Sequence, residues 1–392
     1  MRTMKSDISG SVRCIIQAVK SRGDAALIAY TRQFDARTLK PAEIQVSSRD
    51  ISSSGKALEP KVRTALDQAA AAISLFHRRE LRGLQKTWKV RRRGVVLGQT
   101  MTPIDSIGIY VPGGRYSYPS TVLMTAICAR IAGVKRVVMA TPPKNVTPAV
   151  LYAAHISGVE VVYRVGGAQA IAALAMGTHS IPRVDMIVGP GNAYVNEAKR
   201  QVYGTTGIDS LAGPSEVAII ADAGADPAFI IADSMAQAEH DPMARAYVFT
   251  DSAKVAAAVR KGVDKTYSSQ IHVTQCSVNR AVDMVNAIAP EHLEILTVDP
   301  DAIVLRIRHA GAIFAGYATP TALGDYLAGP SHVLPTGGTA RFSSGLSVAT
   351  FLKRTSYIKY SAAAAASSAK SGVVLAETEG LHHHAASLRA RS

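Results

Sequence analysis

The sequence predicts an α/β protein with two parallel sheets, each covered by helices. From Ile107 onwards, short apolar runs alternate with helical segments, and most runs end in turns rich in glycine or proline. After Ala212-Gly-Pro-Ser215 the same alternation starts again. A strand that is followed by a helix and then another strand favours a parallel sheet, because the helix carries the chain back across one face of the sheet.

Two amphipathic helices are expected before the first block. Residues 11–34 place apolar side chains such as Val12 and Ile15 on one side, and residues 60–80 show a similar pattern. The second helix ends in a basic run, 77–93, which holds much of the net charge of +15. This run is interpreted either as a nucleic-acid patch or as a solvated helix and strand edge. The second interpretation is favoured, because aromatic residues hardly interleave with the charges, and no nucleic-acid partner is expected.

The first block contains four apolar runs and three helical segments. The runs cover 107–111, 136–140, 159–163 and 185–188, and the helical segments cover 121–132, 168–176 and about 193–203. The last run leads into Gly189-Pro-Gly-Asn192, which lacks the third glycine of a dinucleotide fingerprint. A plain strand-to-helix turn is at least as good an interpretation, although such a turn at a helix N-terminus can bind phosphate.

The second block repeats the pattern as far as residue 288. Strands are expected at 217–221, 247–249 and 271–274, and helices at 227–239, 253–263 and 279–288. Two such blocks suggest two Rossmann-like modules. The Ala/Ser-rich segment 361–370 is too plain for a core and is expected to form a packed helix or arm.

Length and composition limit the class of protein. The chain has 392 residues, which suggests two or three domains. Its composition, with 47% hydrophobic and 19% charged residues, excludes a disordered chain. Cys14, Cys128 and Cys276 form no CxxC pair, which excludes a disulfide framework and a thiolate zinc finger and fits a reducing cytoplasm. No signal peptide is visible, and the longest uncharged stretch, 165–182, is too polar for a membrane span.

Several histidine and carboxylate side chains are candidates for a metal site without thiolate ligands. Gln237 and His240 are three residues apart and share one face of a predicted helix. Asp325 and His332 flank a loop rich in glycine and proline, and three histidines, 382–384, lie near the C-terminus. Nitrogen and oxygen ligands of this kind suit zinc and related cations. Taken singly, each histidine also has a plain explanation as a surface or hydrogen-bonded residue.

Glu291 and His292 are adjacent and follow a predicted helix. Neighbours in an extended chain point to opposite sides, so the two side chains suit separate roles around one substrate. An exposed loop pair is the alternative interpretation. None of the three cysteines lies in these clusters, so no thiol nucleophile is predicted.

Ten segments of the chain, taken together, resemble the histidinol dehydrogenases. In chain order they are GIYVPGG, STVLM, ARIAGVKRVV, VGGAQAIAALAMGT, VGPGNAYVNEAKRQV, AGPSEVAIIAD, QAEHD, APEHLE, GDYLAGPSHVLPT and EGLHHHAASLRAR. The resemblance covers nearly the whole chain from about residue 11 and is specific at family level.

The resemblance implies a zinc-dependent, NAD-linked enzyme of the last steps of histidine biosynthesis. It would oxidise L-histidinol to L-histidine through an aldehyde, with two NAD used in succession and one zinc ion per subunit. The implied fold has two incomplete Rossmann-like domains, one inserted in the other, and an extended helical tail exchanged within a cytoplasmic homodimer. The expected boundaries are 1–110 plus 217–346 for the first domain with its N-terminal helices, 111–216 for the inserted NAD-binding domain, and 347–392 for the tail.

The resemblance also assigns residues to roles. Glu291 and His292 match the catalytic pair, with His292 as general base and Glu291 as activator of water. The zinc ligands would be Gln237, His240, Asp325 and His384, where His384 follows from the family spacing Glu-x-Leu-x-x-His. The substrate contacts would add Ser215, His332 and Glu379 to His292 and the zinc ligands, and the NAD contacts would be Tyr110, Gln169 and Asn192. His384 and Glu379 would come from the partner subunit.

The chain departs from the family pattern in three places. Its N-terminus is shorter than usual, and relatives carry a longer helical segment between 263 and 271. Arg115-Tyr116 is similar to a branch that oxidises small sulfonated diols, whereas APEHLE and EGLHHHA follow the histidinol branch. Two alternatives therefore stand beside histidinol dehydrogenase: a zinc- and NAD-dependent dehydrogenase of another small alcohol, and a non-catalytic basic binding protein on the same scaffold.

Overall fold

The computed structural model describes residues 7–84, 87–113 and 117–391. The chain divides into two compact units, one of residues up to 81 together with 104–350, the other of 82–103 together with 351–392. Arg115 and Tyr116, which carry the similarity to the sulfonated-diol branch, lie outside the described residues.

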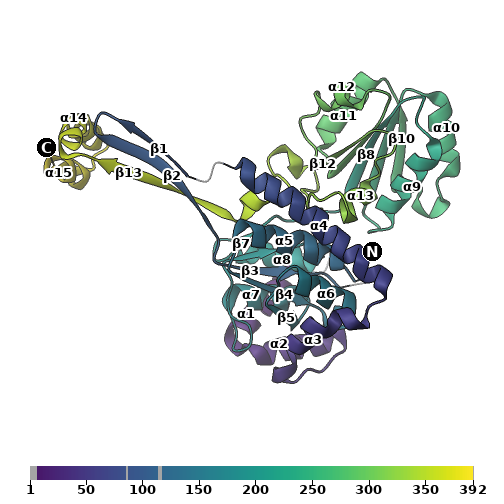
Figure 1. Ribbon diagram of the computed structural model, residues 1–392, viewed down its shortest axis with the longest axis horizontal. Helices are drawn as coiled ribbons and strands as arrows, with labels where there is room; N and C mark the ends of the chain where they lie inside the picture. Colours follow the sequence, from purple (N-terminus) through teal and green to yellow (C-terminus); the bar gives the residue numbers. More distant parts are fainter. Residues whose placement is uncertain (1–6, 85–86, 114–116, 392) are drawn as a thin grey trace. The chain divides into compact units, whose positions relative to one another are not determined.

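The first unit contains a parallel sheet of five strands in the order β5-β4-β3-β6-β7 (Figure 1). Its strands are β3 (Ser106–Tyr110), β4 (Arg136–Thr141), β5 (Val161–Arg164), β6 (Met186–Val188) and β7 (Gly207–Ile208). Ile107 pairs with Val137 of β4 and with Met186 of β6, so β3 is the central strand. All five residues of β3 are buried, as expected of an apolar run inside a parallel sheet.

Helices surround this sheet, and the two N-terminal helices pack against helices of this group. The helices are α5 (Pro119–Ala132), α6 (Pro148–Ile156), α7 (Gly167–Met176) and α8 (Ala193–Val202), with α1 (Ile8–Arg22) and α2 (Asp24–Asp35) packed on α7 and α1 also on α8. The single helix predicted over 11–34 is wrong, because the chain breaks at Gly23, whose φ of 52° is left-handed. Two further helices follow, α3 (Ser48–Ser53) and α4 (Pro60–Gly83).

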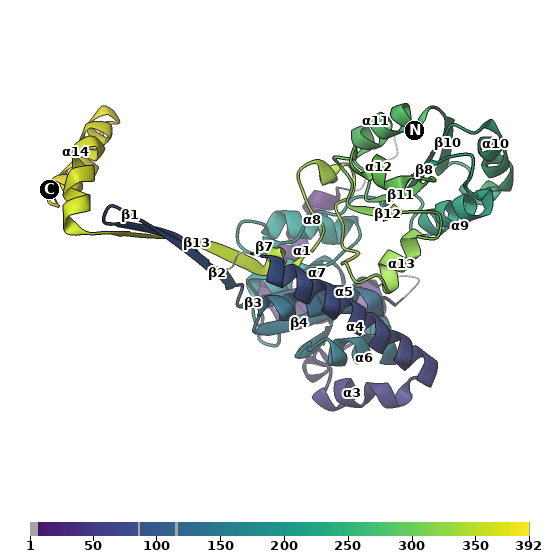
Figure 2. The same ribbon diagram turned by 45° about the horizontal axis from the view of Figure 1, so that its top comes forward.

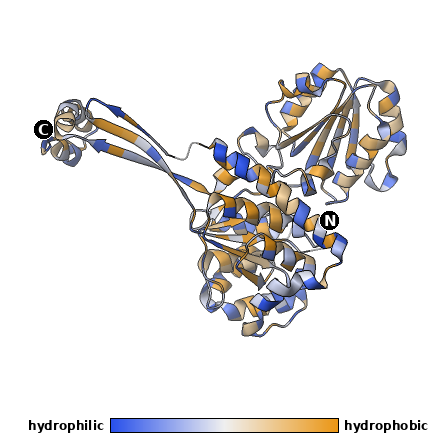
Figure 3. Cartoon of the chain, viewed as in Figure 1, coloured by the Kyte–Doolittle hydropathy of each residue, from blue (hydrophilic) through white to orange (hydrophobic). Residues whose placement is uncertain are grey.

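A second parallel sheet of five strands lies in the same unit and has the order β10-β9-β8-β11-β12. Its strands are β8 (Glu216–Ala221), β9 (Arg245–Thr250), β10 (Ile271–Gln275), β11 (His292–Leu296) and β12 (Ala312–Ala315). Its helices are α9 (Pro227–Ala238), α10 (Ala253–Gly262), α11 (Val278–Ile288), α12 (Pro300–Val304) and α13 (Thr321–Tyr326). Figure 3 shows apolar residues along the strands of both sheets.

Successive residues of β8 enter different apolar clusters. Val217 and Ile219 belong to the core that includes residues of α9 and α10, whereas Ala218 and Ile220 belong to the core that includes residues of α11. The second sheet is therefore covered on both faces, as the sequence pattern predicts for a parallel sheet.

The arrangement of β3 differs from the domain boundary expected at residue 110. β3 is hydrogen-bonded between β4 and β6, so it belongs to the sheet of the expected insert. The helices α1 and α2 likewise pack on α7, which lies in that insert. The hydrogen bonds of β3 thus move the boundary from residue 110 to a position before Ser106. The insertion of one domain in the other stays a proposal.

The second unit, called the arm below, holds an antiparallel sheet and two helices. Its strands are β1 (Thr87–Arg92), β2 (Val95–Pro103) and β13 (Leu352–Tyr360) in the order β1-β2-β13, and its helices are α14 (Ala362–Thr378) and α15 (His382–Arg389). Figure 2 shows β2 and β13 side by side as a long ribbon that leads to α14. The Ala/Ser-rich segment forms the start of α14, and most of the basic run 77–93 lies at the end of α4 and in the exposed β1. In the described ranges, no helix combines the length and the apolar character needed to cross a membrane.

Candidate active site

A cavity of about 620 Å³ opens at the carboxyl ends of the strands of the first sheet. Its lining includes Tyr110, which ends β3, together with Pro142, Gly167 and Asn192, which follow β4, β5 and β6. The strand order reverses between β3 and β6, and this switch point is where parallel α/β sheets bind dinucleotides. All three residues assigned to NAD by resemblance, Tyr110, Gln169 and Asn192, line this one cavity.

Tyr110 and Gln169 are both buried at the wall of the cavity. The Tyr110 hydroxyl accepts a hydrogen bond from the Gly167 N–H at 3.0 Å, and burial raises the pKa of Tyr110 to about 12. The Oε1 atom of Gln169 is buried and receives no hydrogen bond. Buried acceptors are normally paired, so a ligand that offers hydroxyl or amide donors would satisfy this atom. NAD carries both kinds of donor, and the residues present therefore fit it.

The other wall of the cavity comes from α2, which the sequence reasoning left out. The rings of Tyr30 and Phe34 stack there with centroids 5.7 Å apart and an interplanar angle of 1°. Asp35 lies beside them, and burial raises the pKa of its carboxyl group. The spacing of Tyr30 and Phe34 on one helix face was the available signal.

The turn from Gly189 to Asn192 is bound tightly to the end of β3. Gly189 has a φ of 112°, and a Cβ atom there would lie 2.2 Å from the Tyr110 carbonyl oxygen, so glycine is required. Asn192 caps α8, because its Oδ1 accepts hydrogen bonds from the N–H groups of Tyr194 and Val195, both at 3.1 Å.

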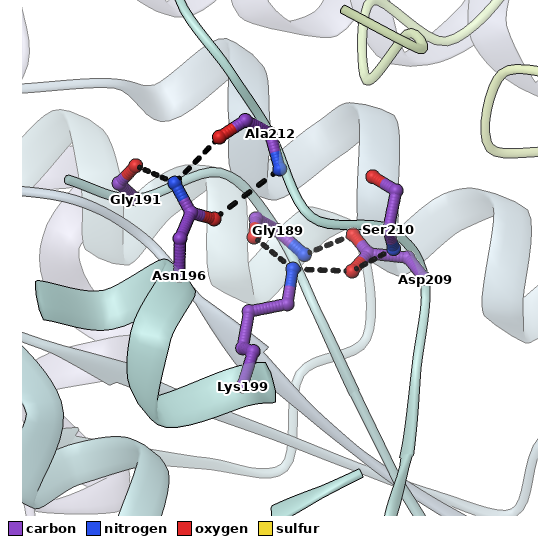
Figure 4. A network of polar contacts seen from close by, with 7 residues as sticks. All are labelled: Gly189, Gly191, Asn196, Lys199, Asp209, Ser210 and Ala212. Carbon is purple, nitrogen blue, oxygen red and sulfur yellow. Dashed lines mark hydrogen bonds and ion pairs between the residues drawn. The ribbon is translucent and has the colours of Figure 1, made fainter. Parts of the chain in front are cut away.

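A buried polar network holds this turn from the side of α8 (Figure 4). The Lys199 ammonium group is 1% exposed, pairs with Asp209 and donates to the Gly189 carbonyl oxygen at 3.1 Å. Asp209 also accepts from the Gly189 N–H at 2.7 Å. Asn196 donates to the carbonyl oxygens of Gly191 and Ala212 at 2.9 and 2.7 Å. The turn is thus preorganised, and its anchoring residues were not predicted from the sequence.

A second group of predicted residues meets at the amino ends of β8 and β11. Ser215 precedes β8, Glu291 precedes β11, and Gln237 lies in the last turn of α9. The Nε2 group of Gln237 donates to the Ser215 hydroxyl at 2.6 Å, and that hydroxyl donates to the Glu291 carboxylate. This arrangement uses the nitrogen of the Gln237 amide and leaves its oxygen for a cation.

Glu291 and His292 are buried, so their interpretation as an exposed loop pair is wrong. The His292 Nδ1 lies 3.8 Å from the Glu291 Oε2, which is beyond a hydrogen bond, and Nδ1 is buried without a partner. Burial raises the pKa of Glu291 to about 8, and nearby carboxylates add to this shift. Burial lowers the pKa of His292 to about 3, and two nearby histidines add to that shift. Both shifts have the same cause, because burial favours the uncharged form of each side chain.

Asp325, His332 and His240 lie near the same pair. The His332 Nδ1 is 3.1 Å from the Asp325 backbone oxygen and 3.9 Å from its Oδ1, and its Nε2 is 3.3 Å from the Thr121 hydroxyl. Burial raises the pKa of Asp325, while His332 and His240 act in the opposite direction by their charge. His240 follows α9 and lines a cavity of about 940 Å³ that also includes Tyr326. Thr121 was not predicted.

The donors in this region fit a zinc ion. Gln237 and Asp325 offer oxygen, His240 offers an imidazole nitrogen, and the set contains no thiolate. An open set of this kind leaves positions for substrate atoms, unlike a closed structural site. The orphaned Nδ1 of His292 adds a buried acceptor beside these donors.

The remaining predicted residues, Glu379 and His384, belong to the arm. Glu379 follows α14 as its C-cap and His384 lies in the first turn of α15, and both are exposed there together with His382 and His383. Their part in the site stays a prediction.

Another group of metal-ligating atoms lies on α4 and α5. His77 Nδ1, Glu80 Oε2 and Cys128 Sγ lie within 4.8 Å of one another, the only such group of three found in the described part of the chain. The His77 Nδ1 is 2.8 Å from Glu80 Oε2 and 3.7 Å from Cys128 Sγ. Burial raises the pKa of the Cys128 thiol well above its usual range, which disfavours the reactive thiolate form.

Comparisons with known proteins agree over the whole length of the chain. The profile described as histidinol dehydrogenase matches residues 1–392. The histidinol dehydrogenase of Thermosynechococcus vestitus is 49% identical and aligns with 98% of this chain and 93% of its own length. That of Rhizobium meliloti is 47% identical and aligns with 100% and 93%. The crystal structure of histidinol dehydrogenase from Elizabethkingia anophelis superposes with a TM-score of 0.91 at 32% identity, covering 100% of this chain and 93% of that one.

Proposed function

The chain belongs to the histidinol dehydrogenase family, and from this premise we propose which of its residues carry out the reaction. As a member it is an NAD-dependent oxidoreductase that oxidises histidinol in histidine biosynthesis. The relatives give no support to another alcohol as substrate or to a non-catalytic binding protein. The observation that carries the residue assignment is the chain of hydrogen bonds from Gln237 through Ser215 to Glu291, beside the buried His292.

Gln237, His240 and Asp325 would hold a zinc ion, with His384 as the fourth protein ligand. When bound, the ion would fix the imidazole and amine of histidinol. His332 and Ser215 would contact the substrate, as Glu379 would from the arm. His332 is already oriented for this, because both of its ring nitrogens have polar partners.

His292 would act as the general base that takes the proton of the alcohol. Its imidazole is buried in the site, and its Nδ1 has no other hydrogen bond to give up. Glu291 would activate water for the aldehyde step. Its raised pKa suits a group that exchanges a proton near neutral pH.

The cavity at Tyr110, Gln169 and Asn192 would hold NAD, which accepts the hydride in each of the two oxidation steps. Gln169 Oε1 would accept a hydrogen bond from the dinucleotide, and the stacked Tyr30 and Phe34 would offer an apolar surface to one of its rings. The four-electron course from L-histidinol through histidinal to L-histidine follows from using this site twice.

The active unit would be a homodimer in which the arms are exchanged. Val90, Leu97 and Ile358 pair across the arm sheet in one row and are 51%, 42% and 67% exposed. Trp88 and Tyr360 lie on the same face and are also exposed, which leaves an apolar face that a second copy would cover. The exchanged arm would bring Glu379 and His384 to the partner's site. A cytoplasmic location belongs to the same proposal, and the three free cysteines suit a reducing compartment.

The zinc assignment is tested by measuring the metal content of the protein and the zinc affinity of variants of the three adjacent histidines. We expect one zinc per chain, and loss of turnover after chelation. His384→Ala should weaken zinc binding strongly, whereas His382→Ala and His383→Ala, the matched controls, should leave it nearly unchanged. A fully active metal-free preparation would contradict the metal assignment, and equal losses in the three variants would contradict the choice of His384.

A further inference from the structure

A fully buried carboxyl group lies two residues beyond His292 and takes no part in the reaction proposed above. Glu294 is in β11, is 0% exposed, and pairs in register with Ile219 of β8 and Phe314 of β12. Residues two apart in a strand share a face, so Glu294 points to the same side of the sheet as His292. A carboxyl group in such surroundings needs hydrogen-bond partners, because its desolvation is costly.

One oxygen of Glu294 anchors the helix that carries Asp325. Glu294 Oε1 accepts a hydrogen bond from the Thr321 N–H at 2.7 Å and a second one from the Thr321 hydroxyl group. Thr321 is the first residue of α13, and Asp325 lies four residues later on the same side of that helix. The position of Asp325 is therefore fixed to β11 through Glu294.

The other partner of Glu294 lies on the helix that carries Gln237. The carboxyl group of Asp233 lies within hydrogen-bonding range of that of Glu294, and Asp233 precedes Gln237 by one turn of α9. The Oε2 atom of Glu294 is buried and has no hydrogen-bond partner when both carboxyl groups are ionised. Two carboxylates have no proton to share, so the bond requires that one of the pair is protonated. Burial supports this, since it raises the pKa of Glu294 to about 7 and also raises the pKa of Asp233.

We propose that the hydrogen-bonded pair of Glu294 and Asp233 is a positioning device for the metal site. It fixes α9 and α13 to β11, and it thereby sets the spacing between Gln237 and Asp325. An apolar pair of similar size would fill the space but would not define the rotation of either helix. The inference rests on the assignment of Gln237 and Asp325 as metal ligands.

Two matched pairs of variants test the proposal. Asp233→Asn keeps a hydrogen bond, because its amide can donate to the Glu294 carboxylate, whereas Asp233→Ala removes it. Glu294→Gln likewise keeps both contacts and Glu294→Leu removes both. Zinc affinity is measured by competition with a chromophoric chelator, and the coordination geometry by the visible spectrum of the cobalt(II) form. We expect a loss in zinc affinity of about 10- to 100-fold in Asp233→Ala and Glu294→Leu, with an altered cobalt spectrum. Asp233→Asn and Glu294→Gln should resemble the unchanged chain in both measurements.

A control separates positioning from general loss of stability. Asp226 caps the same helix α9 by accepting a hydrogen bond from the Ala228 N–H at 2.8 Å, far from Glu294 along the helix. Asp226→Ala should lower the melting temperature without changing zinc affinity or the cobalt spectrum. An equal loss of zinc affinity in Asp226→Ala and Asp233→Ala would overturn the proposal. An unchanged zinc affinity in Asp233→Ala would also overturn it. The Asp233→Ala variant keeps the proposal testable if Glu294→Leu does not fold.

The ligand assignment is checked separately with Gln237→Ala and His240→Ala. If these two variants keep the zinc affinity and cobalt spectrum of the unchanged chain, the proposed metal site is wrong, and the positioning inference fails with it. If they change both while Asp233→Ala changes neither, only the positioning inference fails.

Discussion

Glu291 and His292 are neighbours in the chain, yet burial moves their pKa values in opposite directions. A carboxyl group removed from water retains its proton, whereas an imidazole loses it, so burial raises the pKa of Glu291 to about 8 and lowers that of His292 to about 3. The two side chains do not hydrogen-bond to each other, since 3.8 Å separates Nδ1 from Oε2. This lack of direct contact agrees with the separate roles proposed above, His292 as the base for the alcohol proton and Glu291 as the activator of water.

The two roles can be separated by reaction step. Glu291→Gln keeps the shape and hydrogen-bonding reach of the side chain but loses the basic oxygen. It should slow aldehyde oxidation by about 100- to 10,000-fold and alcohol oxidation far less. His292→Ala should slow both steps, because both need a base for a hydroxyl proton. Single-turnover NADH formation from histidinol and from histidinal measures each step.

The outcome against this division of roles is also clear. Equal slowing from both starting compounds in Glu291→Gln would mean that Glu291 positions the site as a whole. Ser215→Ala serves as a reference for that case, because it removes the hydrogen bonds that connect Glu291 to Gln237 without changing any charge.

The buried Glu216 predicts a pH dependence of stability. Its Oε1 accepts hydrogen bonds from the N–H groups of Gly337 and Gly338, and burial raises its pKa to about 6 from an ordinary value of 4.5. The unfolded carboxyl group ionises first as the pH rises, so this group lowers the free energy of unfolding between pH 4.5 and 6, by roughly 2 kcal/mol in total. Glu216→Gln lacks this titration. Urea unfolding at several pH values should therefore show the variant gaining relative to the unchanged chain across that window, and a constant difference would contradict the prediction.

At the scale of elements, the two sheets have the same strand order but hold their candidate sites at opposite ends. In the first sheet the cavity lies at the carboxyl ends of β3 and β6, where this order leaves a crevice. In the second sheet Asp222 follows β8 at the equivalent position and accepts hydrogen bonds from the Val298 N–H at 2.8 Å and from the Tyr317 hydroxyl. The residues with chemistry meet at the amino ends of those strands instead.

The network behind the glycine turn predicts a coupled loss of stability and NAD binding. Lys199→Ala would leave Asp209 buried without its partner, which typically costs about 3–5 kcal/mol. It would also remove the donor to the Gly189 carbonyl oxygen and so loosen the wall of the cavity proposed to bind NAD. Chemical denaturation and calorimetric titration with NAD measure the two effects. Arg200→Ala is a matched control, because Arg200 is exposed on the same helix and pairs only with Glu197 among the contacts described.

At the scale of the whole molecule, the arm has an apolar face that is exposed within its own unit. The other face of its sheet carries basic residues. One of them, Lys89, lies over the Tyr357 ring, and its ammonium nitrogen is 4.4 Å from the ring centroid. The first face also carries Arg92 and Arg354, but it gathers the exposed apolar side chains, which suits a sheet that is covered on one side only. The exchanged arm would provide that cover.

Subunit exchange tests the composite site. Mixing His384→Ala with His292→Ala chains, both inactive alone, should restore part of the activity under conditions that exchange subunits. In a heterodimer one of the two sites would combine an intact His292 from one chain with an intact His384 from the other. Verified heterodimers without activity would show that each site is built from one chain, and a mixture of His384→Ala with itself is the control.

The local pattern of this sequence determined most strands and helices of both sheets, because alternation of apolar runs and amphipathic segments is a property of neighbouring residues. Runs such as 107–111 and 136–140 coincide with β3 and β4 to within a residue. The family also followed from the sequence, because the ten segments quoted above occur in the order that is typical of histidinol dehydrogenases. The break at Gly23 and the strand β11 were not predicted, because a single glycine and a five-residue run containing Glu and His carry little local signal.

Tertiary structure alone decided which of these residues meet. Tyr110, Gln169 and Asn192 reach one cavity only because β3, β5 and β6 end at the same edge of a sheet. The roles of Lys199, Asp233 and Glu294 were invisible in the sequence, since each depends on a partner brought close by folding. The reason is physical: a pKa or a buried hydrogen bond is set by the atoms around a group in space, and sequence patterns describe only the neighbours along the chain.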